Sequence, residues 1–343
     1  MKTLGWNSSW LWPAVICLVI ALLLLLTGLL VGSQGLESLS RIGDFSNSGA
    51  TAGSASSHGA ILWEIRLPRS LGAWLAGCLL GLAGCVAQGL FRNPLADPYL
   101  LGSASGAIVG VALALAILEW SPAASPTLAL LGLTGAAFTG AVVAVALTLL
   151  LAGGAQQPLR LLLAGVVVGV VLGAAGSLLT IALPQLLQPM QAFMLGSTAF
   201  IGLQACLLMA GVLMVCWLAA LLLAPALDGG ALGEVTAVSL GLPQAPMRAG
   251  LIGVLALATG TAVAQTGLIA FIGLAAPHVA RHWVKSTHAG LMLLSSLVGG
   301  VLLMAADILA RGLLAPIELP VGVLTALLGG CYLLRLMHRS RLL

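Results

Sequence analysis

Charge is scarce in this 343-residue sequence: only 6% of the residues are Asp, Glu, Lys or Arg, against roughly 25% in a typical soluble domain. Aromatic residues are also few, at 5%. This composition excludes an ordinary soluble globular domain. Instead, 60% of the residues are apolar and glycine occurs 44 times. A membrane-spanning helix needs about 20 apolar residues, and small residues let such helices pack closely. We therefore expect an all-α polytopic membrane protein.

Motifs for metal binding and catalysis are missing as well. The six cysteines lie in apolar runs without C-x-x-C spacing, so we interpret them as core residues and predict no metal site. The two lysines, Lys2 and Lys285, follow Met1 and Val284, so the Gly-Lys pair of a P-loop is absent. Neither H-E-x-x-H nor G-x-S-x-G occurs. We expect no intrinsic catalytic activity and no cofactor in this chain.

Apolar segments predict about ten transmembrane helices in one domain spanning residues 1–343. Their expected ranges are 13–33, 68–90, 97–118, 127–151, 161–183, 203–224, 248–269, 272–284, 290–310 and 321–337. The stretch 184–202 is too interrupted to span and favours a short re-entrant helix. The Ser-, Gly- and Ala-rich segment 34–60 indicates a flexible outer linker, and 225–248 is the longest predicted cytoplasmic loop.

The basic residues give an orientation for these helices. With a cytoplasmic N-terminus and ten alternating spans, four of the 13 Lys and Arg residues fall outside, which leaves nine inside. The four outer residues are Arg41, Arg66, Arg69 and Arg311. This excess agrees with the positive-inside rule and places both termini in the cytoplasm. Because the positive charges flank predicted spans, they do not indicate nucleic-acid binding.

The acidic residues leave the energy source open. All nine lie in loops or near predicted helix ends. Asp307 stands four residues before Arg311, so the two can pair on one helix face. An ion-coupled transporter would instead use such a carboxylate for ion or proton binding. We favour a separate ATPase as the driving partner. Its docking surface could be the 231–242 stretch, which the pattern predicts as a short amphipathic helix or an ordinary connecting loop.

Four ordered motifs resemble the FecCD-type permeases, the membrane subunits of ABC importers for iron-siderophores, haem and vitamin B12. They are "IRLPRSLGAWLAGCLLGLAGCVAQGLFRNPLADPYLLGSASGA" (65–107), "LGEVTAVSLGL" (232–242), "GLIAFIGLAAPHVARHW" (267–283) and "ADILARGLLAPIELPVGVLTALLGG" (306–330). The resemblance covers roughly residues 60–335. It implies the type II ABC importer permease fold in the bacterial inner membrane, with an iron chelate as cargo and vitamin B12 as the alternative.

The resemblance also implies partners. Two copies would form a homodimer with the pathway at their interface. Two cytoplasmic ABC ATPase subunits would bind ATP and Mg, and a periplasmic or lipoprotein substrate-binding protein would deliver the metal chelate from outside. An ion-coupled secondary transporter that works alone remains the contrasting hypothesis.

Three sets of residues match functional positions of that family. The matching arginines on the outer face meet acidic residues of the binding protein; here they are Arg66, Arg69 and Arg311. The inner gate positions are Asn93, Leu95, Gln157, Pro158 and Leu159. The coupling helix that seats in the ATPase matches Gly233, Glu234, Ala237, Leu240 and Gly241. The alternatives are anchoring at the membrane interface, a rigid proline-rich turn and a plain connecting loop.

Two further features carry weaker signals. His278 in "PHVAR" (277–281) invites interpretation as a haem ligand, but a structural role at a helix end is favoured. The uncharged segment 161–179 and residues 190–200 match pathway-lining segments of the family. Close packing through small residues is the alternative for the first of these segments.

Overall fold

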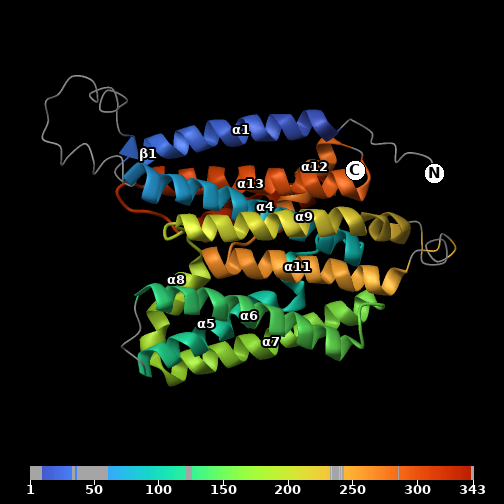
Figure 1. Cartoon of the computed structure of the whole chain (residues 1–343), viewed down its shortest axis with the longest axis horizontal. Coiled ribbons are helices and arrows are strands. Elements are labelled where there is room, and N and C mark those ends of the chain that lie inside the picture. The colour runs from blue at the N-terminus through green and yellow to red at the C-terminus, as the bar shows by residue number, and fades with distance from the viewer. Residues whose placement is uncertain are drawn as a thin grey trace, which may run out of the picture.

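The computed structural model describes residues 10–32, 35–36, 61–120, 126–231, 233, 239, 241, 243–284 and 286–340. Within these residues the chain is a bundle of helices, most of which run along one common axis (Figure 1). The only strands described are β1 (Val31–Gly32) and β2 (Gly35–Leu36), which pair antiparallel. Most of the predicted 34–60 linker lies outside the described residues.

All ten predicted segments contain a helix. The helices are α1 (Leu11–Leu30), α4 (Leu67–Phe91), α5 (Ser103–Trp120), α6 (Pro126–Ala152), α7 (Pro158–Ala182), α8 (Leu187–Leu195), α9 (Leu203–Ala231), α11 (Gln244–Thr266), α12 (Ile272–Trp283), α13 (His288–Gly312) and α14 (Val321–Ser340). Short helical turns complete them: η3 (Ile61–Arg66), η4 (Pro98–Leu101) and η5 (Pro184–Leu186). The predicted short helix after residue 184 is confirmed as α8.

Seven of the described helices are long and apolar enough to cross a membrane. They are α1, η3 with α4, α6, α7, α9, α11 and α13. Shorter apolar stretches occur in α5 and α14, and α12 has 12 residues. Many large apolar side chains on α1, α7 and α9 face outward, for example Val170 at 67% exposure and Leu222 at 69%. Such a surface is stable in lipid, and the chain is a multi-pass membrane protein.

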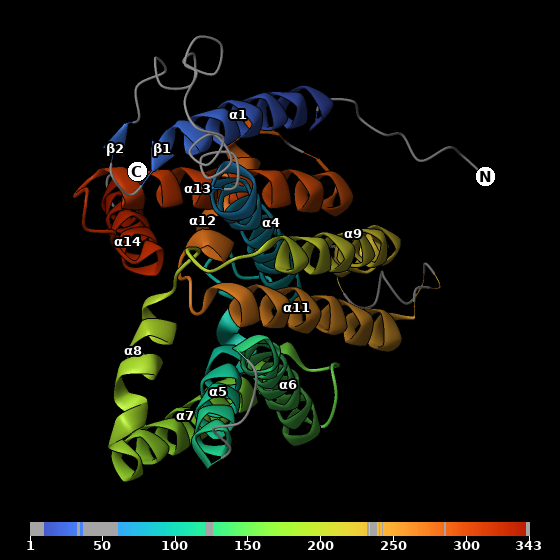
Figure 2. The ribbon, with the colours of Figure 1, turned by 60° about the vertical axis from the view of Figure 1, so that its left-hand side comes forward.

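Helix α4 lies at the centre of the bundle, against α9, α11, α12 and α13 (Figures 1 and 2). Almost all of its residues are buried, and its glycines allow backbone contact with its neighbours. A Cβ at Gly84 would overlap the carbonyl oxygen of Gly273 in α12, and one at Gly77 would overlap that of Gly299 in α13. Small residues therefore set the helix spacing here, as expected for helices in a membrane.

The predicted cytoplasmic loop 225–248 is too long. Residues 225–231 continue α9 through Pro225, and residues 244–248 already belong to α11. Proline in a helix removes one hydrogen bond and clashes with the preceding turn, and for that reason the sequence favoured a stop. Burial of Ala226 and Leu227 against the bundle offsets this cost.

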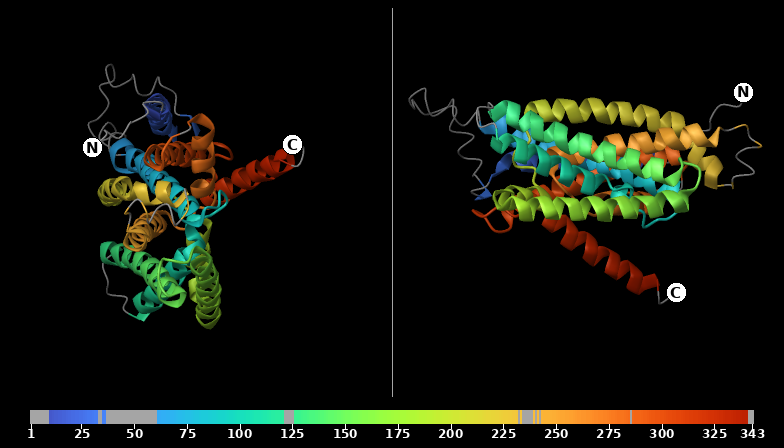
Figure 3. Two further views of the ribbon diagram at one scale, coloured as in Figure 1. Left: turned by 90° about the vertical axis from the view of Figure 1, so that its right-hand side faces the viewer. Right: turned by 90° about the horizontal axis from the view of Figure 1, so that it is seen from below.

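Both ends of the bundle can be identified by their elements. The start of α1, the end of α9, the start of α11 and the end of α14 lie at one end, here called the α9–α11 end (Figures 1 and 3). Strand β1 and the start of α4 lie at the opposite end, the β1 end. Helices α5, α6 and α7 form one side of the molecule, and α14 leans away from the other helices (Figure 3).

Candidate functional site

The β1 end holds a buried cluster of four charged residues, the β1-end ionic cluster: Arg69, Asp307, Arg311 and Glu318. The carboxylate of Asp307 forms ion pairs with two arginines. Its Oδ2 lies 2.6 Å from Arg311 Nη2, and its Oδ1 lies 3.2 Å from Arg69 Nε. Arg69 Nη1 also donates to both carboxylate oxygens of Glu318, at 2.9 and 3.1 Å. The predicted ion pair between Asp307 and Arg311 is confirmed. Two positive and two negative charges balance within the cluster.

Further hydrogen bonds connect the cluster to other elements. Arg311 Nη1 donates to the carbonyl oxygen of Gly28 in α1, at 3.2 Å, and its Nη2 donates to Ser70 Oγ in α4, at 3.1 Å. The hydroxyl of Thr198, which lies between α8 and α9, donates to Asp307 Oδ1 at 2.5 Å. One buried carboxylate and its arginines therefore hold α1, α4, α13 and the α8–α9 connection together.

The three arginines predicted to dock a binding protein all lie at the β1 end, in different environments. Arg311 is 2% exposed and Arg69 is 8% exposed, and both form ion pairs within the chain. Arg66 is half-buried and donates from Nη1 to the carbonyl oxygen of Leu29 at 3.0 Å. The docking role stays a prediction.

Sequence reasoning missed Glu318 and Thr198 as members of this cluster. Glu318 pairs with a residue 249 positions away, and Thr198 bonds to one 109 positions away. Neither lies in a local pattern that indicates such a partner. Helical spacing revealed Asp307 and Arg311 because they stand four residues apart.

A compact turn follows α4 at the α9–α11 end. Arg92 takes a left-handed conformation (φ 49°) and ends the helix, with its backbone N–H directed at the carbonyls of Gln88 and Gly89. The side-chain oxygen of Asn93 accepts the backbone N–H of Leu95 at 2.9 Å. The turn therefore has a fixed shape, and it presents the apolar side chain of Leu95, which is 54% exposed.

The second half of this turn is anchored in the bundle. Asp97 caps η4 by accepting the backbone N–H of Tyr99 at 2.8 Å. Burial raises the pKa of the Asp97 carboxyl, and the hydrogen bond from Tyr99 opposes that shift. The Tyr99 hydroxyl donates to the carbonyl oxygen of Ile269 at 3.1 Å, and the backbone of η4 packs on Gly165 of α7.

A second turn precedes α7 at the same end (Figure 1). Gln157 has an extended backbone, Pro158 opens the helix, and Leu159 is 82% exposed. Arg248 of α11 donates from Nη1 to the carbonyl oxygen of Gln156 at 2.9 Å, which fixes the turn to the bundle. Leu95 and Leu159 are thus exposed apolar groups on rigid turns. Their predicted role as a gate stays a prediction.

Of the five predicted coupling residues, the structure describes two. Gly233 (φ 105°) and Gly241 (φ 72°) have positive φ, a backbone conformation that suits glycine. Glu234, Ala237 and Leu240 lie outside the described residues. Near the start of this segment, Asp228 of α9 accepts the backbone N–H of His288 at 3.1 Å and pairs with its ring Nδ1 at 2.6 Å. This contact joins the end of α9 to the start of α13.

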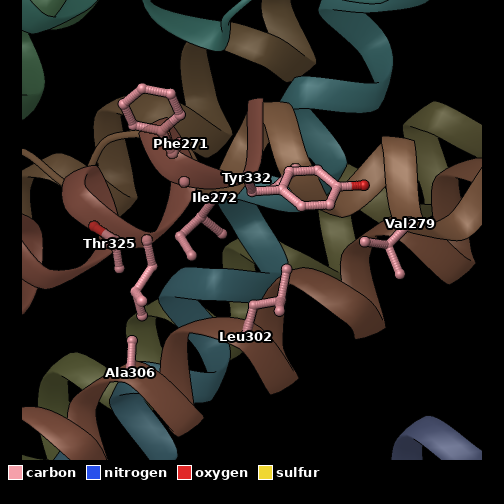
Figure 4. A pocket seen from close by; sticks show the side chains of 10 residues that line it. Phe271, Ile272, Val279, Leu302, Ala306, Thr325 and Tyr332 are labelled. Carbon is pink, nitrogen blue, oxygen red and sulfur yellow. The ribbon is translucent and has the colours of Figure 1, made fainter. Parts of the chain in front are cut away.

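An apolar cavity of about 310 Å³ lies between α12, α13 and α14 (Figure 4). Its lining includes Phe271, Leu302 and Tyr332. His278 lies beside the cavity, with its ring centroid 4.7 Å from that of His282 and 5.7 Å from that of Tyr332. No group of three His, Cys, Asp or Glu suited to a metal ion occurs in the part of the chain that was described.

Comparison with known proteins agrees with this architecture. The model of the FecCD transport family matches residues 13–339. The hemin transport system permease protein HmuU of Yersinia pestis is 38% identical over 93% of this chain and 95% of its own length. For the ferric enterobactin permease FepD of Escherichia coli K12, the identity is 39% over 82% of each chain. The vitamin B12 permease BtuC of Escherichia coli O157:H7 is 37% identical over 94% of this chain and 93% of its own.

A solved structure shares the fold. It is described as a metal-chelate type ABC transporter in an inward-facing conformation, and it superimposes with a TM-score of 0.79 at 28% identity. The match covers 94% of this chain and 99% of the other. Because the family model, the full-length relatives and the fold agree over nearly the whole sequence, the chain belongs to the FecCD transport family of ABC importer permeases.

Proposed function

We propose that this chain is the permease subunit of an ATP-driven importer that moves an iron chelate, a siderophore or haem, across the bacterial inner membrane. The match of residues 13–339 to the FecCD family carries this proposal. Relatives of nearly equal identity are named for haem, ferric enterobactin and vitamin B12. Overall identity therefore does not select the cargo, and vitamin B12 is the second candidate.

In the proposed topology the ten α-helices other than α8 cross the membrane, with both termini in the cytoplasm. The α9–α11 end then faces the cytoplasm and the β1 end faces outward. The placement of the α1 start and the α14 end at one end of the bundle supports termini on the same side of the membrane. The excess of basic residues predicted for the cytoplasmic side supports this orientation.

The proposed assembly has two copies of this chain, two ABC ATPase subunits and a substrate-binding protein. The cargo would pass between the copies, lined by α7 and α8. Helix α7 carries exposed apolar side chains such as Leu163, Val167 and Leu178, which suit either lipid or a second copy. The ATPase would supply the energy, because we predict no nucleotide site in this chain.

Three groups of residues have proposed roles in transport. The segment that includes Gly233 and Gly241 would couple to the ATPase. The Leu95 and Leu159 turns would narrow the inner mouth of the pathway, since both side chains are exposed and apolar on rigid backbone. At the β1 end, Arg66 and Arg69 would meet acidic groups of the binding protein.

Native mass spectrometry of the tagged chain, mildly solubilised from its own host, tests the assembly. We expect two copies of this 34.5 kDa chain with two ATPase subunits. A chain or bare dimer that reproducibly lacks an ATPase, across several detergents, would favour an ion-coupled transporter that works alone.

Uptake into proteoliposomes tests the cargo. The complex is reconstituted with ATP inside and offered ⁵⁵Fe-siderophores, ⁵⁵Fe-haem or ⁵⁷Co-cobalamin in separate assays. ATP-dependent uptake of one iron chelate supports the proposal, whereas uptake of cobalamin alone selects the second candidate. Uptake that follows a proton or sodium gradient without ATP would contradict both.

A further inference from the structure

The β1-end ionic cluster has a fully buried half and a partly exposed half. The side chains of Asp307 and Arg311 are 0% and 2% exposed, so groups from outside cannot reach them in this conformation. The side chain of Glu318 is 30% exposed, and the side chain of Arg69, which is 10% exposed, lies between the two carboxylates. Glu318 is therefore the one member of the cluster that is substantially accessible at the surface.

The contact between Arg69 and Glu318 is not the best that a guanidinium can form. A single nitrogen, Nη1, is shared by both oxygens of Glu318, while Nε is directed to Asp307. The remaining nitrogen, Nη2, makes no hydrogen bond within the described part of the chain. A carboxylate binds arginine more strongly when two nitrogens donate to its two oxygens in parallel. Arg69 therefore retains donor capacity for a second or better-placed carboxylate.

Exchange of Glu318 on Arg69 for a carboxylate of another protein is energetically favourable. Partly exposed ion pairs contribute little to stability, so little is lost when Glu318 leaves. Arg69 still needs a negative charge at this position, because its guanidinium is largely buried beside Arg311. Replacement of one carboxylate by another keeps the cluster neutral.

Glu318 lies in the connection between α13 and α14, so its release has a structural consequence. The next residue, Leu319, donates its backbone N–H to the carbonyl oxygen of Ala310 at 3.1 Å. At the start of α14, Gly322 donates to the carbonyl oxygen of Gly196 at the end of α8, at 3.5 Å. Loss of the Arg69 contact would free this connection from α4, next to the segment that the proposed pathway uses.

From these contacts we propose that Glu318 is an internal placeholder on Arg69, which an acidic side chain of a docking protein displaces. Displacement transfers Arg69 to the docking protein and releases the α13–α14 connection. This inference rests on the proposed function for the identity of the docking protein. The chemistry itself requires only a protein carboxylate at the β1 end.

The first test measures binding of a hexaglutamate peptide to the full-length chain in nanodiscs, with hexaglutamine as the uncharged peptide. Glu318→Gln removes the placeholder. Glu64→Gln is the matched control, because it removes the same charge from an exposed residue on the segment that leads into α4. We expect Glu318→Gln to bind hexaglutamate about two- to fivefold more tightly than the wild type, as expected when a weak competing ion pair is removed. Glu64→Gln should change binding less.

The double variant Arg69→Gln with Glu318→Gln should lose this gain. An equal gain in Glu64→Gln, or no gain in Glu318→Gln, would overturn the proposal, because either result assigns the effect to general surface charge. Weaker binding by Glu318→Gln would show that Glu318 itself contacts the peptide, and it would also overturn the proposal.

Hydrogen exchange of the wild-type protein provides a second readout that needs no variant. Saturating hexaglutamate should raise the exchange rate of the Leu319 amide and leave α4 protected. Bound peptide with unchanged exchange at Leu319 would contradict displacement. These assays contain neither ATPase nor cargo. Their failure therefore leaves the importer assembly untouched, while a missing ATPase in native mass spectrometry contradicts the assembly whatever the peptide does.

Discussion

Replacement of Asp307 by asparagine tests how strongly the β1-end ionic cluster stabilises the protein. Asparagine keeps the shape of the side chain but removes the charge that Arg311 and Arg69 share. Arg69 keeps Glu318, whereas Arg311, at 2% exposure, loses its ion pair with Asp307. Removal of one partner of a buried ion pair costs about 3–5 kcal/mol. The unfolding equilibrium should therefore shift by about two to four orders of magnitude.

Unfolding in mixed micelles with increasing SDS, followed by tryptophan fluorescence, measures this free energy. Glu318→Gln should lower it by no more than about 1 kcal/mol, because that ion pair is partly exposed. The double variant Asp307→Asn with Arg311→Met should be more stable than Asp307→Asn alone, since no unpaired charge remains buried. If Asp307→Asn costs less than 1 kcal/mol, or if the double variant shows purely additive losses, the cluster does not stabilise the bundle as argued.

Two further predictions use the same unfolding assay. Gly84→Ala should destabilise the protein by about 1–3 kcal/mol, because the new methyl group would overlap the carbonyl of Gly273 and push α12 away. Gly253→Ala, on the exposed face of α11 with open space around it, should be neutral or slightly stabilising, and equal losses in both variants would refute the packing argument. Burial raises the pKa of Asp97, so the folded state retains a proton that the unfolded state has lost. The contribution of Asp97 to stability should therefore fall as the pH rises above about 3.9 through the raised pKa, and Asp97→Asn should remove this dependence while still accepting the N–H of Tyr99. If the stability of Asp97→Asn depends on pH as that of the wild type does, this assignment to Asp97 is wrong.

The main elements of the fold were predictable because they depend on local composition. Apolar runs of sufficient length form helices, and each of the ten predicted segments contains one. The interrupted stretch after residue 184 was also expected to form a short helix, which is α8. The ion pair between Asp307 and Arg311 could be predicted because helical spacing brings residues four apart onto one face.

The end of α9 and the burial of two arginines depend on tertiary packing, so local sequence patterns could not predict them. Helix α9 continues through Pro225 because burial of the following residues offsets the lost hydrogen bond. Arg69 and Arg311, predicted as surface docking residues, are buried among carboxylates that come from distant parts of the sequence. The sequence by itself determined a multi-pass helical membrane protein of one family. Only the tertiary structure showed that the arginines at the β1 end already have partners within the chain, because ion pairing across hundreds of residues depends on which helix ends meet in space.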